Sequence, residues 1–281
     1  MSWDGLAAVA VHRIFLAVVL VLTLAGMAQS QSRPKDKVTW YGFTSGTLRF
    51  PNSNQQADEG NLFTEPLFFL GYALHDSDRT RLSLFTHAIL SLDSQGKSFN
   101  NVDKGGIGLR YRWKVSRAFS LTFNARYDWS RQRKTGRKFS GRRLSIDAFY
   151  YKAWFDQDRR KPFLLQGRST VFRAYANLYT PGSLTPDDNN VVLSFGGELA
   201  ERFPIKDSKF RWALFADLTG SWDADGNNYN NKLVPALGAK LEYPIKGGSL
   251  FAGARLRTDW RWIRGTFDTA PGLIVGWYKA F

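Results

Sequence analysis

The sequence predicts an all-β protein, an antiparallel transmembrane β-barrel of about 12 strands. Three observations support this fold class: extended segments alternate apolar and polar side chains at a period of two, short turns alternate with longer polar loops, and Phe, Trp and Tyr make up 15% of the chain. A barrel in a bilayer requires these features, because one face of each strand meets lipid and the other faces the lumen.

The first residues are typical of an export signal. An apolar run over residues 14–25 follows Arg13, and the small-x-small cleavage pattern Gly26-Met27-Ala28 comes directly after it. We expect residues 1–28 to be a secretory signal peptide, residues 29–36 a periplasmic lead-in and residues 37–281 the barrel. The alternative is a membrane anchor, but the run is shorter than the roughly 20 apolar residues that span a bilayer.

The first half of the barrel is predicted from composition and alternation. Residues 37–50 are rich in Thr, Trp, Tyr and Phe, which favour strands, and residues 61–75 end at a tight Asp-Ser-Asp turn. Residues 79–93 and 102–114 alternate leucines or aromatics with polar or arginine side chains. The alternation is cleanest in residues 119–129, where apolar and polar residues separate into two faces: Phe119, Leu121, Phe123, Ala125, Tyr127 and Trp129 against Ser120, Thr122, Asn124, Arg126 and Asp128.

The second half follows the same rule. One strand is expected to be irregular, with a bulge near Phe172. The strands predicted there are 142–155, 163–178, 191–203, 210–222, 232–243, 250–262 and the closing segment from residue 271. Short turns are expected at 76–78, 115–117, 156–161, 204–208 and 244–248, and longer loops at 51–60, 95–101, 130–141, 179–190 and 223–231, with a short one around Gly265. In such barrels the short turns face the periplasm, so both termini are predicted to lie there.

The closing segment has two distinct faces. Leu273, Val275, Trp277 and Phe281 share one of them, and the chain ends on that last aromatic residue. This ending resembles Gram-negative outer-membrane β-barrel proteins, whose terminal aromatic residue directs barrel insertion. The resemblance implies a bacterial outer-membrane location and the barrel-assembly machinery as a partner. Lys279 departs from the pattern, because that family usually has a second aromatic residue there.

The charge of the chain predicts what the inward face does. The net charge is +15, and there is no cysteine to form disulfides or thiolate metal sites. In the predicted register roughly 13 inward positions are Lys or Arg and about 6 are acidic, a surplus near +7 that would attract anions. The predicted pore-lining residues are Arg110, Arg112, Arg126, Arg168, Arg255, Arg257 and Arg261, with Asp128, Asp217 and Asp259 as counter-ions.

The sequence therefore predicts an anion-selective pore for small acidic solutes or acidic oligosaccharides. The architecture is similar to that of the small 12-stranded porins for acidic oligosaccharides, such as the oligogalacturonate and sialic-acid channels. Two alternatives stay open. The arginines could pair across strands and fill the barrel, or the chain could be a surface-interaction barrel, similar to those of exopolysaccharide secretion and phage adsorption.

The remaining motifs exclude other classes of function. The outer-membrane phospholipase pattern of a His and a Ser two residues apart is absent, because Ile89 stands two residues after His87. We expect no enzyme activity, no cofactor and no metal. Nucleic-acid binding is not expected either, because the basic residues alternate with apolar ones. Outer-membrane lipid and lipopolysaccharide are the expected partners, the latter through the basic loop that contains Arg131, Arg133, Lys134, Arg137 and Lys138.

Overall fold

A computed structural model of the chain describes residues 40–50, 61–96, 100–155, 169–184, 189–227 and 230–281. The predicted signal peptide and periplasmic lead-in, the loop 51–60 and the turn 156–161 lie outside these residues. Within the described ranges, no helix is long and apolar enough to cross a membrane.

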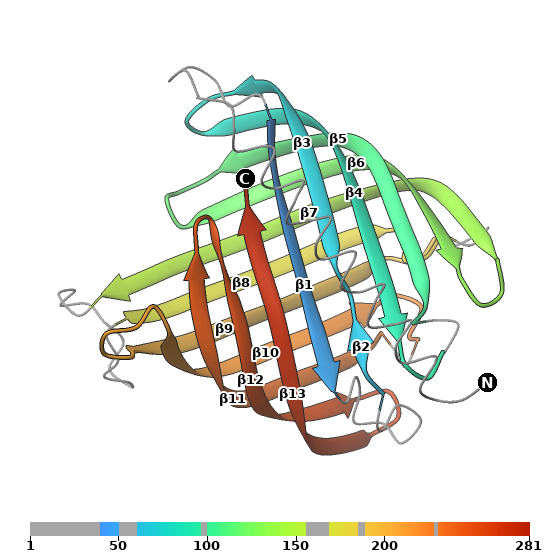
Figure 1. The fold of residues 1–281 in the computed structure, drawn as a ribbon. Helices are drawn as coiled ribbons and strands as arrows, with labels where there is room; N and C mark the ends of the chain where they lie inside the picture. Colours follow the sequence, from blue (N-terminus) through green and yellow to red (C-terminus); the bar gives the residue numbers. More distant parts are fainter. Residues whose placement is uncertain (1–39, 51–60, 97–99, 156–168, 185–188, 228–229) are drawn as a thin grey trace.

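The strands form a single closed antiparallel sheet. Each strand pairs with its neighbours in the chain, and the circle closes between the first and the last strand, which lie side by side in Figure 1. The strands are β1 (Trp40–Phe50), β2 (Phe63–Thr64), β3 (Leu67–Asp76), β4 (Thr80–Asp93), β5 (Val102–Lys114), β6 (Phe119–Gln132), β7 (Lys138–Phe155), β8 (Ser169–Thr180), β9 (Val192–Pro204), β10 (Arg211–Asp223), β11 (Lys232–Ile245), β12 (Gly248–Arg261) and β13 (Thr266–Ala280).

The predicted second strand is interrupted by a proline. Glu65 and Pro66 separate β2 from β3, because a proline has no N–H to donate to the ladder. Both pieces pair with β1 on one side and with β4 on the other, so they occupy one position in the wall. The barrel therefore has twelve strand positions, as predicted, with one of them divided.

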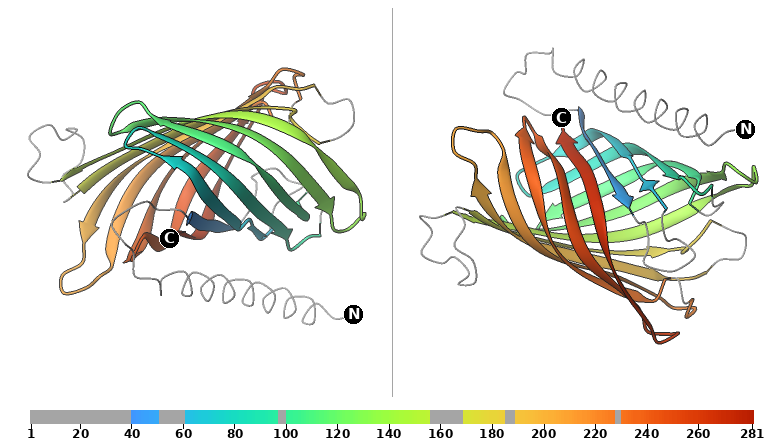
Figure 2. Two further views of the ribbon diagram at one scale, coloured as in Figure 1. Left: turned by 90° about the horizontal axis from the view of Figure 1, so that it is seen from above. Right: turned by 60° about the horizontal axis from the view of Figure 1, so that its bottom comes forward.

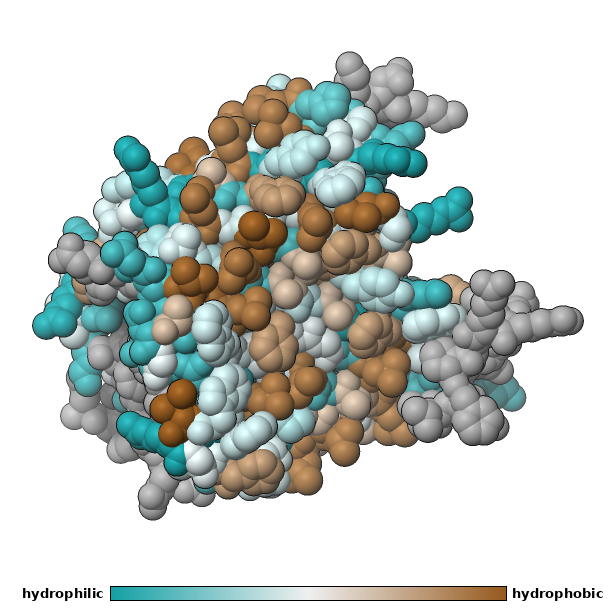
Figure 3. All heavy atoms as spheres, turned by 180° about the vertical axis from the view of Figure 1, so that it is seen from behind, coloured by the Kyte–Doolittle hydropathy of each residue, from teal (hydrophilic) through white to brown (hydrophobic). Residues whose placement is uncertain are grey.

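Alternation along the strands separates an apolar outer face from a polar interior. On β11, Leu237 is 66% exposed on the outside, whereas Val234 and Ala236 are buried inside. The outer face of β13 carries Leu273 and Val275, as predicted from the closing segment. Figure 3 shows apolar side chains across the middle of one side of the molecule and hydrophilic ones toward its margins. Such a surface suits a bilayer.

The ladder between β1 and β13 is completed by tight aromatic packing. The backbones of Gly42 and Phe281 exchange two hydrogen bonds, of 3.1 and 3.0 Å. The indole of Trp277 lies over Gly46 and donates to Thr44 Oγ1 at 3.3 Å. A side chain at position 46 would occupy the space of the indole ring, so glycine is required for this close approach.

Short turns share one end of the barrel with the start of β1 and with the C-terminus. These turns join β3 to β4, β5 to β6, β9 to β10 and β11 to β12. Figure 2 shows from two further sides that the strands make one continuous wall. The end that carries the short turns is called the turn end below, and the opposite end the loop end.

Three predicted details were wrong. The basic loop 130–141 is mostly strand, because β6 and β7 extend to Gln132 and from Lys138. The last strand begins at Thr266 rather than at residue 271. No bulge occurs near Phe172, where the described part of β8 keeps register with both neighbours, whereas the register does shift between Ala73 and His75 in β3.

Candidate functional site

The interior wall is densely charged. Cross-strand pairing fixes which residues face inward, because directly opposed residues share a face of the sheet. The inward basic residues outnumber the acidic ones in the described part of the barrel. The basic residues are Arg49, Arg81, Lys104, Arg110, Arg112, Lys114, Arg126, Arg143, Arg173, Arg202, Arg211, Lys232, Lys240, Arg255, Arg257 and Arg261; the acidic ones are Glu65, Asp76, Asp93, Asp128, Asp147, Glu198, Asp217, Asp223, Glu242, Asp259 and Asp268.

The register places most of the predicted pore-lining residues on this inner wall. Arg168 is the exception, because it lies outside the described residues. The inward ones are Arg110, Arg112, Arg126, Arg255, Arg257, Arg261, Asp128, Asp217 and Asp259. They do not form a single site, because β5 and β6 are far around the wall from β10 and β12.

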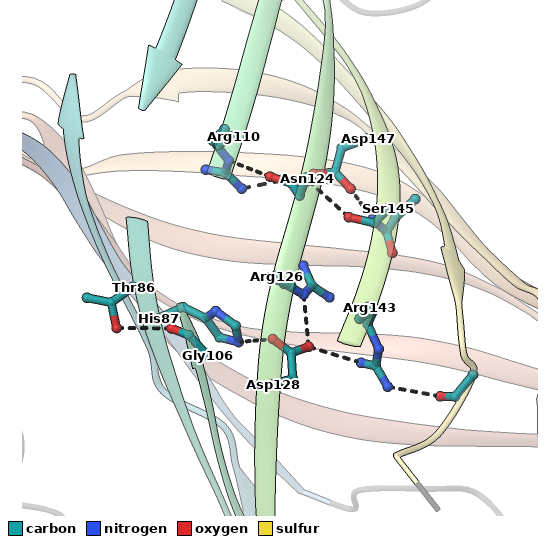
Figure 4. A network of polar contacts seen from close by, with 12 residues as sticks. Thr86, His87, Gly106, Arg110, Asn124, Arg126, Asp128, Arg143, Ser145 and Asp147 are labelled. Atoms are coloured by element: carbon teal, nitrogen blue, oxygen red, sulfur yellow. Dashed lines mark hydrogen bonds and ion pairs between the residues drawn. The ribbon is translucent and has the colours of Figure 1, made fainter. Parts of the chain in front are cut away.

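The β4–β7 side holds a network centred on Asp128, which Figure 4 shows from close by. The Asp128 carboxylate is almost fully buried and lies 2.8 Å from Arg126 Nε, 3.7 Å from Arg143 Nη1 and 3.9 Å from His87 Nε2. Arg143 also donates to the carbonyl of Gly182 at 3.4 Å. One carboxylate therefore orders three inward side chains from three different strands.

A second part of the same network surrounds Arg110. The guanidinium donates to Asn124 Oδ1 at 2.8 Å and lies 4.0 Å from Asp147. Asn124 in turn donates to Ser145 at 2.9 Å and to Asp147 at 2.7 Å. The cation also stacks on the ring of Phe69 at 4.3 Å. Arg110 is thus held by polar and aromatic neighbours, which favours a structural role for it.

The β8–β11 side carries a third set of ion pairs, which the sequence analysis did not single out. Lys240 lies 2.8 Å from Glu198 and 3.4 Å from Glu242, and all three side chains are largely buried. Arg202 and Arg211 each approach Glu242 to 2.8 Å. Basic side chains outnumber the carboxylates here too, because Arg173 shares Glu198 with Lys240, but each basic residue is held in an ion pair.

A constriction lies where β1 faces β8. These strands occupy opposite positions in the twelve-position wall, yet Arg49 from β1 and Tyr175 from β8 are close enough to interact electrostatically. Asp217 from β10 also interacts with Tyr175, and Arg255 from β12 interacts with Arg49 and lies 3.7 Å from Asp217. Side chains from opposite walls therefore face one another across the lumen. We call Arg49, Tyr175, Asp217, Arg255 and Arg257 the constriction.

Positive charge dominates the constriction. Arg257 interacts with both Arg49 and Arg255, and its guanidinium lies 3.7 Å from Asp259. Asp259 is shared, because Arg261 approaches it to 3.9 Å. The Nε of Arg49 is buried and has no hydrogen-bond partner among the described atoms. Three arginines thus face the same part of the lumen.

Part of the interior remains open to solvent. Along β8 the inward side chain of Arg173 is 53% exposed and Tyr175 is 46% exposed, whereas the Glu242 side chain on β11 is only 4% exposed. At the turn end, a hollow of about 700 Å³ is lined by Arg112, Lys114, Phe149 and Tyr151, among others. We call this hollow the vestibule. Open space therefore occurs at the turn-end mouth and beside Arg173 and Tyr175.

Sequence reasoning missed Arg49 and Tyr175. Both lie on the polar face of their strands, so alternation could have indicated their direction: Arg49 follows Ser45 and Thr47, and Tyr175 follows Arg173. What alternation could not reveal is that the two residues meet, because β1 and β8 are neither adjacent in the chain nor paired in the sheet.

The described residues show no group of three His, Asp or Glu side chains that could hold a metal ion.

No protein-family model matches the chain, and no curated protein matches it. Solved structures with a similar fold include the KdgM porin, with 8% identity over 85% of this chain and 99% of that chain and a TM-score of 0.38. They also include LpxR from Salmonella typhimurium, with 10% identity over 84% and 99% and a TM-score of 0.43. The translocator domain of the autotransporter NalP from Neisseria meningitidis shows 14% identity over 99% of both chains and a TM-score of 0.38. At these values the likenesses support no functional argument.

Proposed function

We infer that this chain is a bacterial outer-membrane β-barrel, and we propose that it is a pore that favours anions. The location is supported by the closed sheet with its apolar outer face, which leaves no unpaired strand edge in lipid. The predicted signal peptide and closing aromatic strand agree with that location. In this orientation the turn end faces the periplasm and the loop end faces outward.

The constriction is the observation on which the anion preference depends. Arg49, Arg255 and Arg257 lie together with Lys232 and Arg261, and Glu65, Asp217 and Asp259 balance these five positive charges only in part. Within a low-dielectric wall, such a surplus lowers the energy of an anion and raises that of a cation. Arginine suits this role, because its guanidinium stays charged at physiological pH and binds carboxylate or phosphate in two-pronged geometry.

The same geometry limits the size of the solute. The Arg49 and Tyr175 side chains interact from opposite walls, so a solute must pass beside them, along the exposed surface of Arg173 and Tyr175. Small carboxylates and phosphates fit this description. An acidic oligosaccharide would have to pass in an extended conformation, one chain at a time. Basic residues Arg112 and Lys114 at the vestibule would concentrate the same class of solute.

Planar-bilayer recording of the purified mature chain tests this proposal. Under a KCl gradient, the single-channel reversal potential should have the sign of chloride preference. A reversal potential of the opposite sign would refute the argument from the arginines. A barrel that inserts and passes no current would refute conduction itself.

A second candidate is a non-conducting structural or surface-interaction barrel. The extensive ion-pair networks favour it, because Asp128, Glu198 and Glu242 each join two or more basic residues and fill space between strands. Absence of current in the same recording would support this reading. Neither candidate assigns the chain a catalytic role.

A further inference from the structure

The outer face of β5, β6 and β7 contains an apolar groove. Its volume is about 400 Å³, and its surface is almost entirely apolar. The outward side chains Ile107 and Leu109 from β5, Ala125 and Tyr127 from β6, and Leu144 from β7 line it, and the small Ala125 leaves the space open. A hydrocarbon chain is the kind of group that such a groove accommodates.

A cluster of basic residues lies between this groove and the loop end. Arg142 lines the groove itself and stands opposite Tyr127 in the β6–β7 ladder. Farther toward the loop end, Arg131 and Lys138 are paired directly across the same two strands. All three are exposed on the outer face. We call Arg131, Lys138 and Arg142 the basic triad.

The basic triad carries more positive charge than the carboxylate beside it neutralises. Among the described residues none of its members forms an ion pair, and Asp103, which stands directly opposite Arg131 in the β5–β6 ladder, is bound by Arg133. Like charges placed directly opposite each other on a sheet are destabilising, so an anion bound between Arg131 and Lys138 would stabilise this pair. The interior arginines Arg126 and Arg143, by contrast, share a carboxylate.

The triad also lies at the level where the outer wall changes from apolar to polar. Trp129 is exposed on the outer face opposite Ser140, between Arg142 and Lys138 along the hairpin. Tryptophan at this depth marks the boundary between acyl chains and headgroups. The apolar groove extends from this boundary toward the membrane interior, with Arg142 on its side of Trp129, and Arg131 and Lys138 lie toward the loop end.

We propose that this surface binds one molecule of lipid A, the phosphorylated and acylated glycolipid of the outer leaflet. An acyl chain occupies the groove beside Ala125, and phosphate groups bind the basic triad. The charge complementarity selects a phosphorylated lipid, and the position at the loop end selects the outer leaflet. The proposal rests on the inferred outer-membrane location but not on conduction, so bilayer recordings and lipid binding can fail independently.

Native mass spectrometry of the purified full chain with added lipid A tests the proposal. We expect one tightly bound lipid A on the native chain, and binding weakened roughly tenfold or more in the Arg142→Glu variant, because a charge-assisted contact becomes a repulsion. Ala125→Phe should weaken binding of lipid A while leaving the triad intact. Lys209→Glu, which makes the same charge change at the exposed turn end, is the matched control and should bind as the native chain does.

Two comparisons decide between lipid A and less specific partners. Dephosphorylated lipid A and phosphatidylglycerol should each bind at least tenfold more weakly than lipid A. Equal binding of phosphatidylglycerol would replace the proposal with a general preference for anionic lipid. Unchanged lipid A binding in a folded Arg131→Glu/Lys138→Glu/Arg142→Glu variant would overturn it, and Arg142→Gln provides the milder test if that variant does not fold.

Discussion

Neutralising two arginines of the constriction should remove the anion preference of the pore. The perturbation is the double substitution Arg49→Gln/Arg255→Gln. These side chains interact with each other from β1 and β12, and Arg255 lies 3.7 Å from Asp217. Their loss removes two positive charges from the constriction and leaves Asp217 without its Arg255 partner. Glutamine retains much of the length and polarity of arginine, so the wall should keep its packing.

The expected size of the effect follows from Coulomb's law. A unit charge about 4 Å from a passing anion contributes about 1 kcal/mol in water and about 4 kcal/mol at an effective dielectric constant of 20. Two charges therefore contribute at least about 2 kcal/mol, and each 1.4 kcal/mol corresponds to a factor of about ten. At 0.1 M salt the screening length is about 10 Å, which exceeds these separations. We expect the chloride-to-potassium permeability ratio to fall at least roughly tenfold.

Reversal potentials in planar bilayers measure this ratio directly. Arg142→Gln removes one positive charge from the outer face and is the control, because it should leave the ratio unchanged. Arg110→Gln should shift it little, since Asn124, Asp147 and Phe69 already hold that guanidinium. If the double variant keeps the native ratio, or if Arg142→Gln shifts it equally, the constriction does not set selectivity.

Three further predictions concern the barrel itself. Asp128→Asn should lower the free energy of unfolding, measured by urea titration in lipid, by about 3–5 kcal/mol, because it removes the carboxylate shared by buried cations. The control is Asp103→Asn, which breaks an exposed ion pair and should lower that free energy by at most about 1 kcal/mol. Equal losses in the two variants would contradict a stabilising role for the Asp128 network. Gly248→Ala should destabilise the β12–β13 hairpin by about 1–3 kcal/mol, because the Cβ atom of the new alanine would overlap the Tyr278 carbonyl oxygen. An unchanged midpoint of urea unfolding would contradict this close packing. Leu237→Arg should lower the free energy of unfolding in lipid by about 2–4 kcal/mol, whereas Leu237→Phe should leave it nearly unchanged. Similar urea midpoints for the two variants would argue against a lipid-facing position of Leu237.

The structure confirms most of the fold that alternation predicted. Strands such as β6 and β10 have the expected inward and outward faces, because a period of two fixes side-chain direction wherever one face is apolar. Strand ends were less well predicted. Residues 130–141 contain several charged side chains typical of a loop, yet cross-strand hydrogen bonds extend the β6–β7 hairpin almost to its tip.

The site was predicted only in part. Alternation along single strands indicated the direction of Arg255 and Asp217, and the register agrees. It could not indicate that these residues meet Arg49 and Tyr175, because that encounter depends on how a closed wall brings opposite strands together. Whether a charged inward residue is paired also depends on register between strands, as the shared carboxylate of Asp128 illustrates.

The sequence by itself determined the extended segments, their two faces and the basic character of the interior. These are properties of single strands, where side-chain direction follows position along the chain. Only the tertiary structure decided which charges neutralise one another, which inward residues face one another across the lumen and which outward residues converge on one surface. Those features depend on strand register and barrel closure, which bring together side chains that are distant in the sequence.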